Sequence, residues 1–185
     1  MKTCLRLSAA LLLGLFLCLP ARSDAATSLA WHRHTTDYYL VALPQGWEVN
    51  ENMKMGLYAI SLVSVRPLKP NDVFRENVNV VTENVDPSFD LTEYVNTNVT
   101  GMKKALNQFQ LINSGELQGA YTPCRYMTYT QVAEQYNGTL KAVVFFYLSH
   151  GKAYSMTCTS TQESFAAWFP TFVQIGKSFN FPKAQ

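Results

Sequence analysis

The sequence predicts a single α+β domain in which amphipathic helices flank an antiparallel β-sheet. Residues 124–159 contain three consecutive runs of β-branched and aromatic residues separated by turn signals, as in an antiparallel meander. Two other stretches carry apolar residues at three- and four-residue spacing, the period of a helix that lays one face on a sheet. The chain has 185 residues, and the part that follows its N-terminal leader is long enough for one hydrophobic core.

The first 25 residues are typical of a cleavable export signal. Lys2 and Arg6 give the basic start, and the apolar run of residues 7–19 is too short for a comfortable membrane span. Small residues at Ser23 and Ala25 favour cleavage after Ala25. An uncleaved anchor and a lipid-modified cysteine are the alternatives. We therefore expect an exported protein, most simply a bacterial periplasmic one, with no membrane span in the mature chain.

After this cleavage, residues 26–37 would form a flexible lead-in and residues 38–181 the domain. The leader removes three of the 15 basic residues and one of the 13 acidic ones, so 12 of each remain and the mature chain is formally neutral. A neutral domain without a basic run is a poor candidate for binding nucleic acid or an anionic membrane surface.

Strands precede and follow the first predicted helix. Each combines β-branched or aromatic residues with flanking turn residues, and the strand over 110–118 is weak because it contains Gly115. The strands are expected at residues 38–43, 47–49, 56–65, 77–85, 110–118, 124–132, 140–148 and 154–159. Residues 140–148 are apolar on both faces, so this strand should be central and covered on both sides. Two-residue turns are predicted at Asn137-Gly138 and at His150-Gly151.

The first helix should begin at Asp90, an N-cap residue followed three positions later by Glu93. Its apolar stripe indicates packing on the sheet rather than a ligand groove, and consists of Leu91, Tyr94, Val95, Val99, Met102, Leu106 and Phe109.

The last helix should be capped by Ser160, with Glu163 three positions on. Pro170 predicts a kink, or a second helix that starts there. The inner face is formed by Phe165, Trp168, Phe169, Phe172, Val173, Gly176 and Phe179. Six residues of the two helices are expected to be mostly buried: Tyr94, Val99, Leu106, Phe165, Phe169 and Phe172.

No catalytic, cofactor-binding or metal-binding residues are predicted. The sequence lacks the motifs of P-loop, Rossmann, zinc-protease and serine-hydrolase sites. His32 and His34 lie near Asp37, but two solvated histidines explain them better than a metal site. A cysteine nucleophile with His150 as its base is conceivable, although thiols flanked by apolar strand residues are usually inert.

Three further short patterns carry little weight. Asp86 and Asp90 lack the ligand spacing of a calcium loop. Asn98 and Asn137 fit the N-glycosylation pattern, which matters only in a eukaryotic secretory route.

Five segments together resemble the PsbP-like/DcrB-like superfamily of small α/β domains, which also includes the Mog-type Ran-binding proteins. The segments are Pro44–Trp47, Phe74–Val80, Leu91–Tyr94, Gly151–Tyr154 and Ile175–Phe179, and the resemblance spans residues 38–181. It implies an α/β/α sandwich with an antiparallel sheet, and a role as an accessory or binding module of a larger assembly. It supplies no catalytic residues, and Pro170 and the two cysteines of the mature chain depart from the pattern.

Two functions of different classes follow. The first is an exported, non-enzymatic module that binds a protein partner in the cell envelope; the second is a small-molecule carrier or weak hydrolase that uses an apolar pocket on a sheet face. A concave, partly apolar pocket with convergent polar groups would favour the second. An exposed apolar patch with a polar rim would favour the first.

Cys124 and Cys158 remain after export, and we expect them not to be bonded to each other. With the two turns predicted above, Cys124 lies opposite Gly151 and Cys158 opposite Val143. The two positions are then eight residues apart along the strand between them, roughly 26 Å, whereas a disulfide needs Cα atoms within about 7 Å.

Thiol titration of the denatured, unreduced mature protein should therefore find two free thiols. No free thiol in a monomer would contradict both the strand order and the register.

Overall fold

The computed structural model describes residues 30–55 and 58–182. The predicted export signal lies outside these residues and stays a prediction. The strands are β1 (Trp31–Thr35), β2 (Leu40–Pro44), β3 (Glu48–Met55), β4 (Tyr58–Val65), β5 (Asn77–Asn84), β6 (Gln110–Glu116), β7 (Arg125–Ala133), β8 (Gly138–Ser149) and β9 (Lys152–Thr161). The helices are α1 (Leu91–Ala105), α2 (Phe165–Ser178) and a single 3₁₀ turn, η1 (Glu134–Tyr136).

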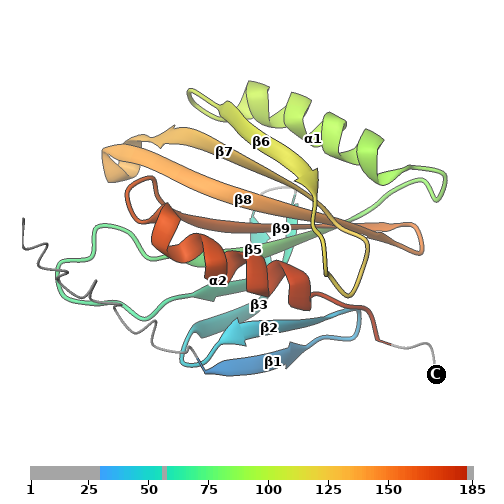
Figure 1. The fold of residues 1–185 in the computed structure, drawn as a ribbon, viewed down its shortest axis with the longest axis horizontal. Coiled ribbons are helices and arrows are strands. Elements are labelled where there is room, and N and C mark those ends of the chain that lie inside the picture. Colours follow the sequence, from blue (N-terminus) through green and yellow to red (C-terminus); the bar gives the residue numbers. More distant parts are fainter. Residues whose placement is uncertain (1–29, 56–57, 183–185) are drawn as a thin grey trace, which may run out of the picture.

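Seven strands form one antiparallel sheet in the order β3-β4-β5-β9-β8-β7-β6, and β1 and β2 form a separate hairpin. Figure 1 shows α1 above the β6–β7 side of the sheet and α2 in front of it, beside the β1–β2 hairpin. Helix α1 contacts β7 and β8, whereas α2 contacts β8, β9 and β2. The predicted α+β domain with a helix on each sheet face is confirmed. Neither helix of the described residues has the length and apolar composition needed to cross a membrane.

Strand β8 is covered on both faces, as its sequence predicts. Residues 142–147 are all buried, and they alternate between the two sides of the sheet. Val143, Phe145 and Tyr147 belong to the core under α2, while Val144 and Phe146 belong to the core under α1. A strand with two apolar faces can be buried only where helices cover both sides, which is the arrangement observed.

The two-residue turn predicted between β8 and β9 is confirmed, whereas the one predicted between β7 and β8 is wrong. His150 and Gly151 adopt the left-handed φ values of 49° and 70° that a two-residue hairpin turn requires. In the other hairpin Ala133 pairs with Gly138, because Glu134–Tyr136 fold into η1 and Asn137 ends it with φ 47°. The tendency of this segment to close a 3₁₀ turn outweighs the Asn-Gly signal, and the register of β7 shifts by four residues.

Helix α1 begins as predicted, with the Asp90 carboxylate accepting a hydrogen bond from the Glu93 N–H at 2.8 Å. The predicted start of the last helix is wrong, and so is the alternative of a second helix that starts at Pro170; the predicted kink stays a prediction. Ser160 is buried within β9, and α2 is one continuous helix whose N-cap is Ser164. Pro170 has no N–H, so one carbonyl of the preceding helical turn lacks its usual hydrogen bond. Because Pro170 is exposed, water can bond to this carbonyl, and the helix continues.

The predicted lead-in over 26–37 contains a strand. β1 pairs with β2 over its whole length, from Trp31↔Pro44 to Thr35↔Leu40. The sequence gives a weak signal here because β1 exposes most of its side chains and is held by backbone pairing rather than by an apolar face.

The helices pack by the predicted stripes, but less deeply at their edges. Tyr94, Phe165 and Phe172 are buried. Val99, Leu106 and Phe169 are half-buried, because they lie along the border of the helix–sheet contact. The cost of Phe169→Ala should therefore fall below the ~3–5 kcal/mol of a fully buried phenylalanine.

Gly176 allows α2 to approach β8 closely. A Cβ atom at this position would lie 2.8 Å from the Phe145 ring, whereas a Cβ at Gly101 of α1 would meet nothing within 4 Å. We expect Gly176→Ala to destabilise the protein by about 1–3 kcal/mol through overpacking. Gly101→Ala should stabilise it by up to about 1 kcal/mol, because alanine is the better helix former. Urea unfolding of both variants measures the two changes in the free energy of unfolding. Changes of the same sign would contradict the close packing of α2 on β8.

Candidate functional site

The three histidines of the chain lie in two separate places. His32 and His34 are on β1, and His34 Nε2 lies 2.7 Å from Glu51 Oε1. His150 is exposed in the β8–β9 turn, where Ser149 Oγ lies 2.7 Å from its Nδ1. Among the described residues no three His, Cys, Asp or Glu side chains are grouped as metal ligands.

The two cysteines are buried, free thiols on the α2 side of the sheet. Extending the observed β7–β8 register by one residue places Cys124 opposite Tyr147, while Cys158 pairs with Val143 as predicted. The offset is therefore four residues, about 13 Å, with β8 between the two strands. Burial raises the pKa of Cys124 to about 12 and raises that of Cys158 strongly, so neither thiol is suited to be a nucleophile.

The acidic and asparagine residues considered in the sequence analysis have local structural roles. Asp86 accepts hydrogen bonds from the N–H and hydroxyl of Ser88, which lowers the pKa of its carboxyl group. Asn98 donates to the Tyr94 carbonyl within α1, and Asn137 ends η1.

A cleft of about 690 Å³ opens where β4 separates from β5. Ser61 is an extra residue in β4, since Leu62 pairs with Val80 but Ile60 pairs with Val81. Such a bulge bends the strand that carries it and redirects side chains. The β4–β5 pairing of the described residues ends at Ile60, and residues 82–84 of β5 line the cleft instead.

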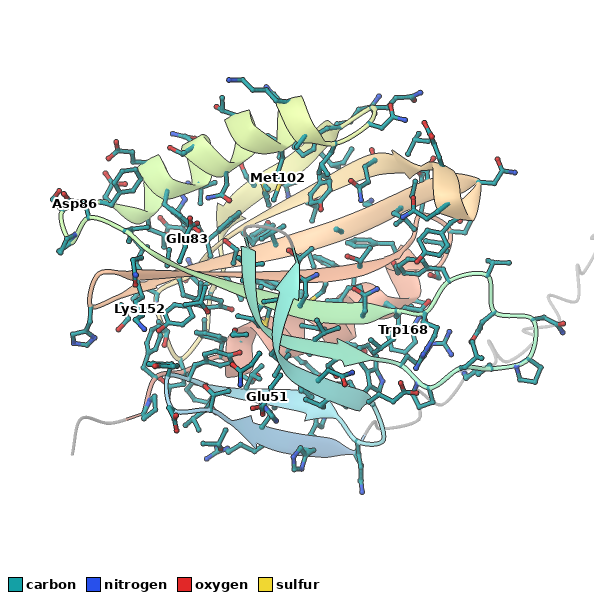
Figure 2. All side chains as sticks on the ribbon, turned by 180° about the vertical axis from the view of Figure 1, so that it is seen from behind. Glu51, Glu83, Asp86, Met102, Lys152 and Trp168 are labelled. Carbon is teal, nitrogen blue, oxygen red and sulfur yellow. The ribbon has the colours of Figure 1, made fainter. Side chains whose placement is uncertain are left out.

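Three chain segments complete the cleft walls. They are the β1–β2 connection, the middle of β3, and the start of β9. Figure 2 shows Glu83 and Lys152 to one side of the β3–β4 hairpin and Glu51 between that hairpin and the β1–β2 hairpin. The lining residues are Thr35, Thr36, Asp37, Tyr38, Tyr39, Glu51, Asn52, Ile60, Ser61, Thr82, Glu83, Asn84 and Lys152.

The Ser61 hydroxyl fixes the floor of the cleft. The Ser61 O–H donates to the Val80 carbonyl at 3.1 Å, so the Ser61 oxygen accepts from the Tyr39 hydroxyl at 2.9 Å. The Thr82 hydroxyl donates to the same oxygen at 3.2 Å. One donor and two acceptor positions are thus all used. Tyr39 is fully buried, and its burial raises the pKa of the phenol to about 12.

Charged residues line the cleft around this floor. Glu51 Oε1 lies beside His34, whereas the Glu83 carboxylate accepts a hydrogen bond from the Tyr94 hydroxyl on the α1 face of the sheet. The Lys152 ammonium lies over the Tyr38 ring, 4.0 Å from its centroid. The cleft therefore presents carboxylates, one ammonium and an aromatic ring around a rigid hydroxyl network.

The cleft could not be located from the sequence. Ser61 is an ordinary polar residue between apolar ones, and nothing in residues 56–65 marks a bulge. The isolated apolar loop residues Leu68 and Val73 and the edge-strand residues Leu111 and Ile112 are exposed, but they lie in separate places. Single exposed apolar side chains of this kind need no functional explanation.

No protein-family model and no curated protein sequence matches this chain. Solved structures do match it, and they show its fold. PsbP (CyanoP) from Synechocystis is 16% identical with a TM-score of 0.63, covering 83% of this chain and 92% of its own. The Ran-binding protein Mog1p from Saccharomyces cerevisiae is 10% identical with a TM-score of 0.56, covering 83% and 96%.

LpqN from Mycobacterium tuberculosis, described as involved in cell envelope biogenesis, is 11% identical with a TM-score of 0.54, covering 83% and 91%. The chain thus has the fold that PsbP and Mog1p share, as the sequence resemblance implies.

The hydrogen bonds that meet at the Ser61 hydroxyl, here called the Ser61 hub, predict how variants of Ser61 and Tyr39 change the free energy of unfolding. Ser61→Ala should cost about 1–3 kcal/mol, because it leaves the buried Tyr39 hydroxyl without its partner. Adding Tyr39→Phe removes the orphaned group, so the double variant should lose less than the sum of the single changes. Chemical denaturation of the three variants gives the coupling energy, and strict additivity would contradict the hub.

Proposed function

We propose that this protein is an exported, non-enzymatic module that binds a protein partner in the cell envelope. The observation that carries the proposal is the preformed cleft at the split between β4 and β5, with a fixed floor and charged walls. Two proteins of the same fold support it: Mog1p is described as Ran-binding, and LpqN as involved in cell envelope biogenesis.

The chemistry of the buried and lining groups favours binding over catalysis. The thiols have raised pKa values in the core, away from the cleft lining. Glu51 is held beside His34, which suits a positioned anionic group at the cleft. Histidine is the side chain that most often serves as a general acid or base, and none is among the lining residues, although His34 contacts the lining carboxylate of Glu51.

A small-molecule carrier is the second candidate, and the cleft itself favours it. Its volume falls within the range of about 300–1,000 Å³ that is typical of ligand sites. It lies at a strand split rather than on an apolar sheet face, because helices and the β1–β2 hairpin cover the central strands.

Cross-linking in intact cells of the source organism, followed by mass spectrometry, tests the proposal. We expect the protein to be recovered from the envelope fraction, with Ala26 as its first residue and a protein partner cross-linked to it. Native mass spectrometry should show the mass of the mature chain alone. A retained small ligand with no cross-linked partner would replace the proposal with the carrier function, and a full-length cytoplasmic protein would contradict export.

A further inference from the structure

We propose that the cleft binds a basic side chain, a lysine ammonium or an arginine guanidinium, and that Lys152 occupies part of its place in the free protein. This inference rests on the proposed protein-binding function and names the chemistry that the partner would present. Three features of the cleft carry it: its charge, its aromatic wall and the state of its hydroxyl groups.

The charge of the lining favours a cation. The two lining carboxylates of Asp37 and Glu51 accompany one ammonium, that of Lys152, which gives a formal excess of one negative charge. Glu83 is not counted, because its carboxylate accepts from Tyr94 on the α1 face of the sheet. The mature chain as a whole is neutral, so this excess is a local concentration. The described contact of Glu51, with His34, uses Oε1, and Oε2 is available to accept from a cation.

The aromatic wall already holds a cation. The Lys152 ammonium is 4.0 Å from the centroid of the Tyr38 ring, within the range of a cation–π interaction. No described carboxylate lies within 4.0 Å of this ammonium, so the ring is the partner that positions it. Tyr38 remains 55% exposed, and its ring is therefore accessible to a second cation.

The hydroxyl groups argue against a neutral, hydroxylated ligand such as a sugar. Ser61 has used its one donor and two acceptor positions, and the Tyr39 and Thr82 hydroxyls each donate to it. The groups left to recognise a ligand are the neutral side chains of Thr35, Asn52 and Asn84 and the charged side chains of Asp37, Glu51 and Lys152. A basic side chain would gain from both the carboxylates and the ring, and it would displace Lys152 from Tyr38.

The test is an NMR titration of the exported protein at low salt with three matched peptides. They are acetyl-Gly-Ser-Xaa-Ser-Gly-amide, where Xaa is arginine, citrulline or glutamate. We expect the arginine peptide to shift the amide signals of Tyr38, Asn52, Asn84 and Lys152 in a saturable way. Citrulline has nearly the same shape but no charge, so its peptide and the glutamate peptide should not bind.

Variants should then change the affinity in opposite directions. Lys152→Met should tighten arginine-peptide binding, because it removes the internal competitor. Tyr38→Leu should weaken it by about two- to fivefold, the size of an exposed cation–π contact. The pair Asp37→Asn with Glu51→Gln keeps the hydrogen-bond acceptors and should weaken binding by about three- to tenfold.

The control pair is Glu93→Gln with Glu163→Gln, which makes the same change of charge at exposed residues outside the cleft lining and should leave the affinity unchanged. Equal binding of the arginine and citrulline peptides would overturn the inference. So would the absence of a saturable shift at 20 mM peptide, which corresponds to a binding free energy of about −2 kcal/mol at most. An unchanged affinity in Lys152→Met would overturn the role of Lys152. A protein partner cross-linked in cells would still support the proposed function in each of these cases. The proposed function and this inference can therefore be contradicted independently.

Discussion

The contact between α2 and β8 is the interaction on which the rest of the structure depends. Gly176 lies directly on the Phe145 ring, and its carbonyl accepts a hydrogen bond from the buried Tyr147 hydroxyl at 2.7 Å. Phe179 stacks on Tyr147 with ring centroids 4.1 Å apart. Burial raises the pKa of Tyr147 well above its ordinary value, so this hydroxyl stays protonated and keeps its donor role. One helix is thereby fixed in position on the central strands.

This anchored helix also determines where the cleft wall stands. Ser178, at the end of α2, accepts a hydrogen bond from the Ala42 N–H of β2 at 2.8 Å. Phe179 stacks on Tyr39 with centroids 4.9 Å apart, and Tyr39 in turn bonds to Ser61. A continuous path of packed rings and hydrogen bonds therefore joins the core to the floor of the cleft. The residues that face the opening are held by the same contacts that stabilise the fold.

The sequence predicted those elements whose signal is local. Helix α1 was predictable because its cap and its stripe agree, and β8 because both of its faces are apolar. The β7 register and the start of α2 failed because competing short turns, η1 and the turn before Ser164, could not be weighed from residue types alone. The cleft joins residues near 38, 51, 61, 83 and 152, and it depends on a one-residue bulge. Single-sequence patterns carry no information on such a meeting of distant segments.

The low identity to proteins of the same fold has a physical explanation. The 10–16% identity to Mog1p, LpqN and PsbP extends over 83% of the chain, which shows that many sequences can satisfy one pattern of buried faces. A recognition site is less tolerant, since it depends on the charge and position of a few side chains. In the proposed site, such side chains line a cleft whose floor hydroxyls are already paired, and the ammonium of Lys152 is held by a ring instead of a carboxylate. Because the fold requires none of this charge pattern, the cleft is where the specific function of this chain should be sought.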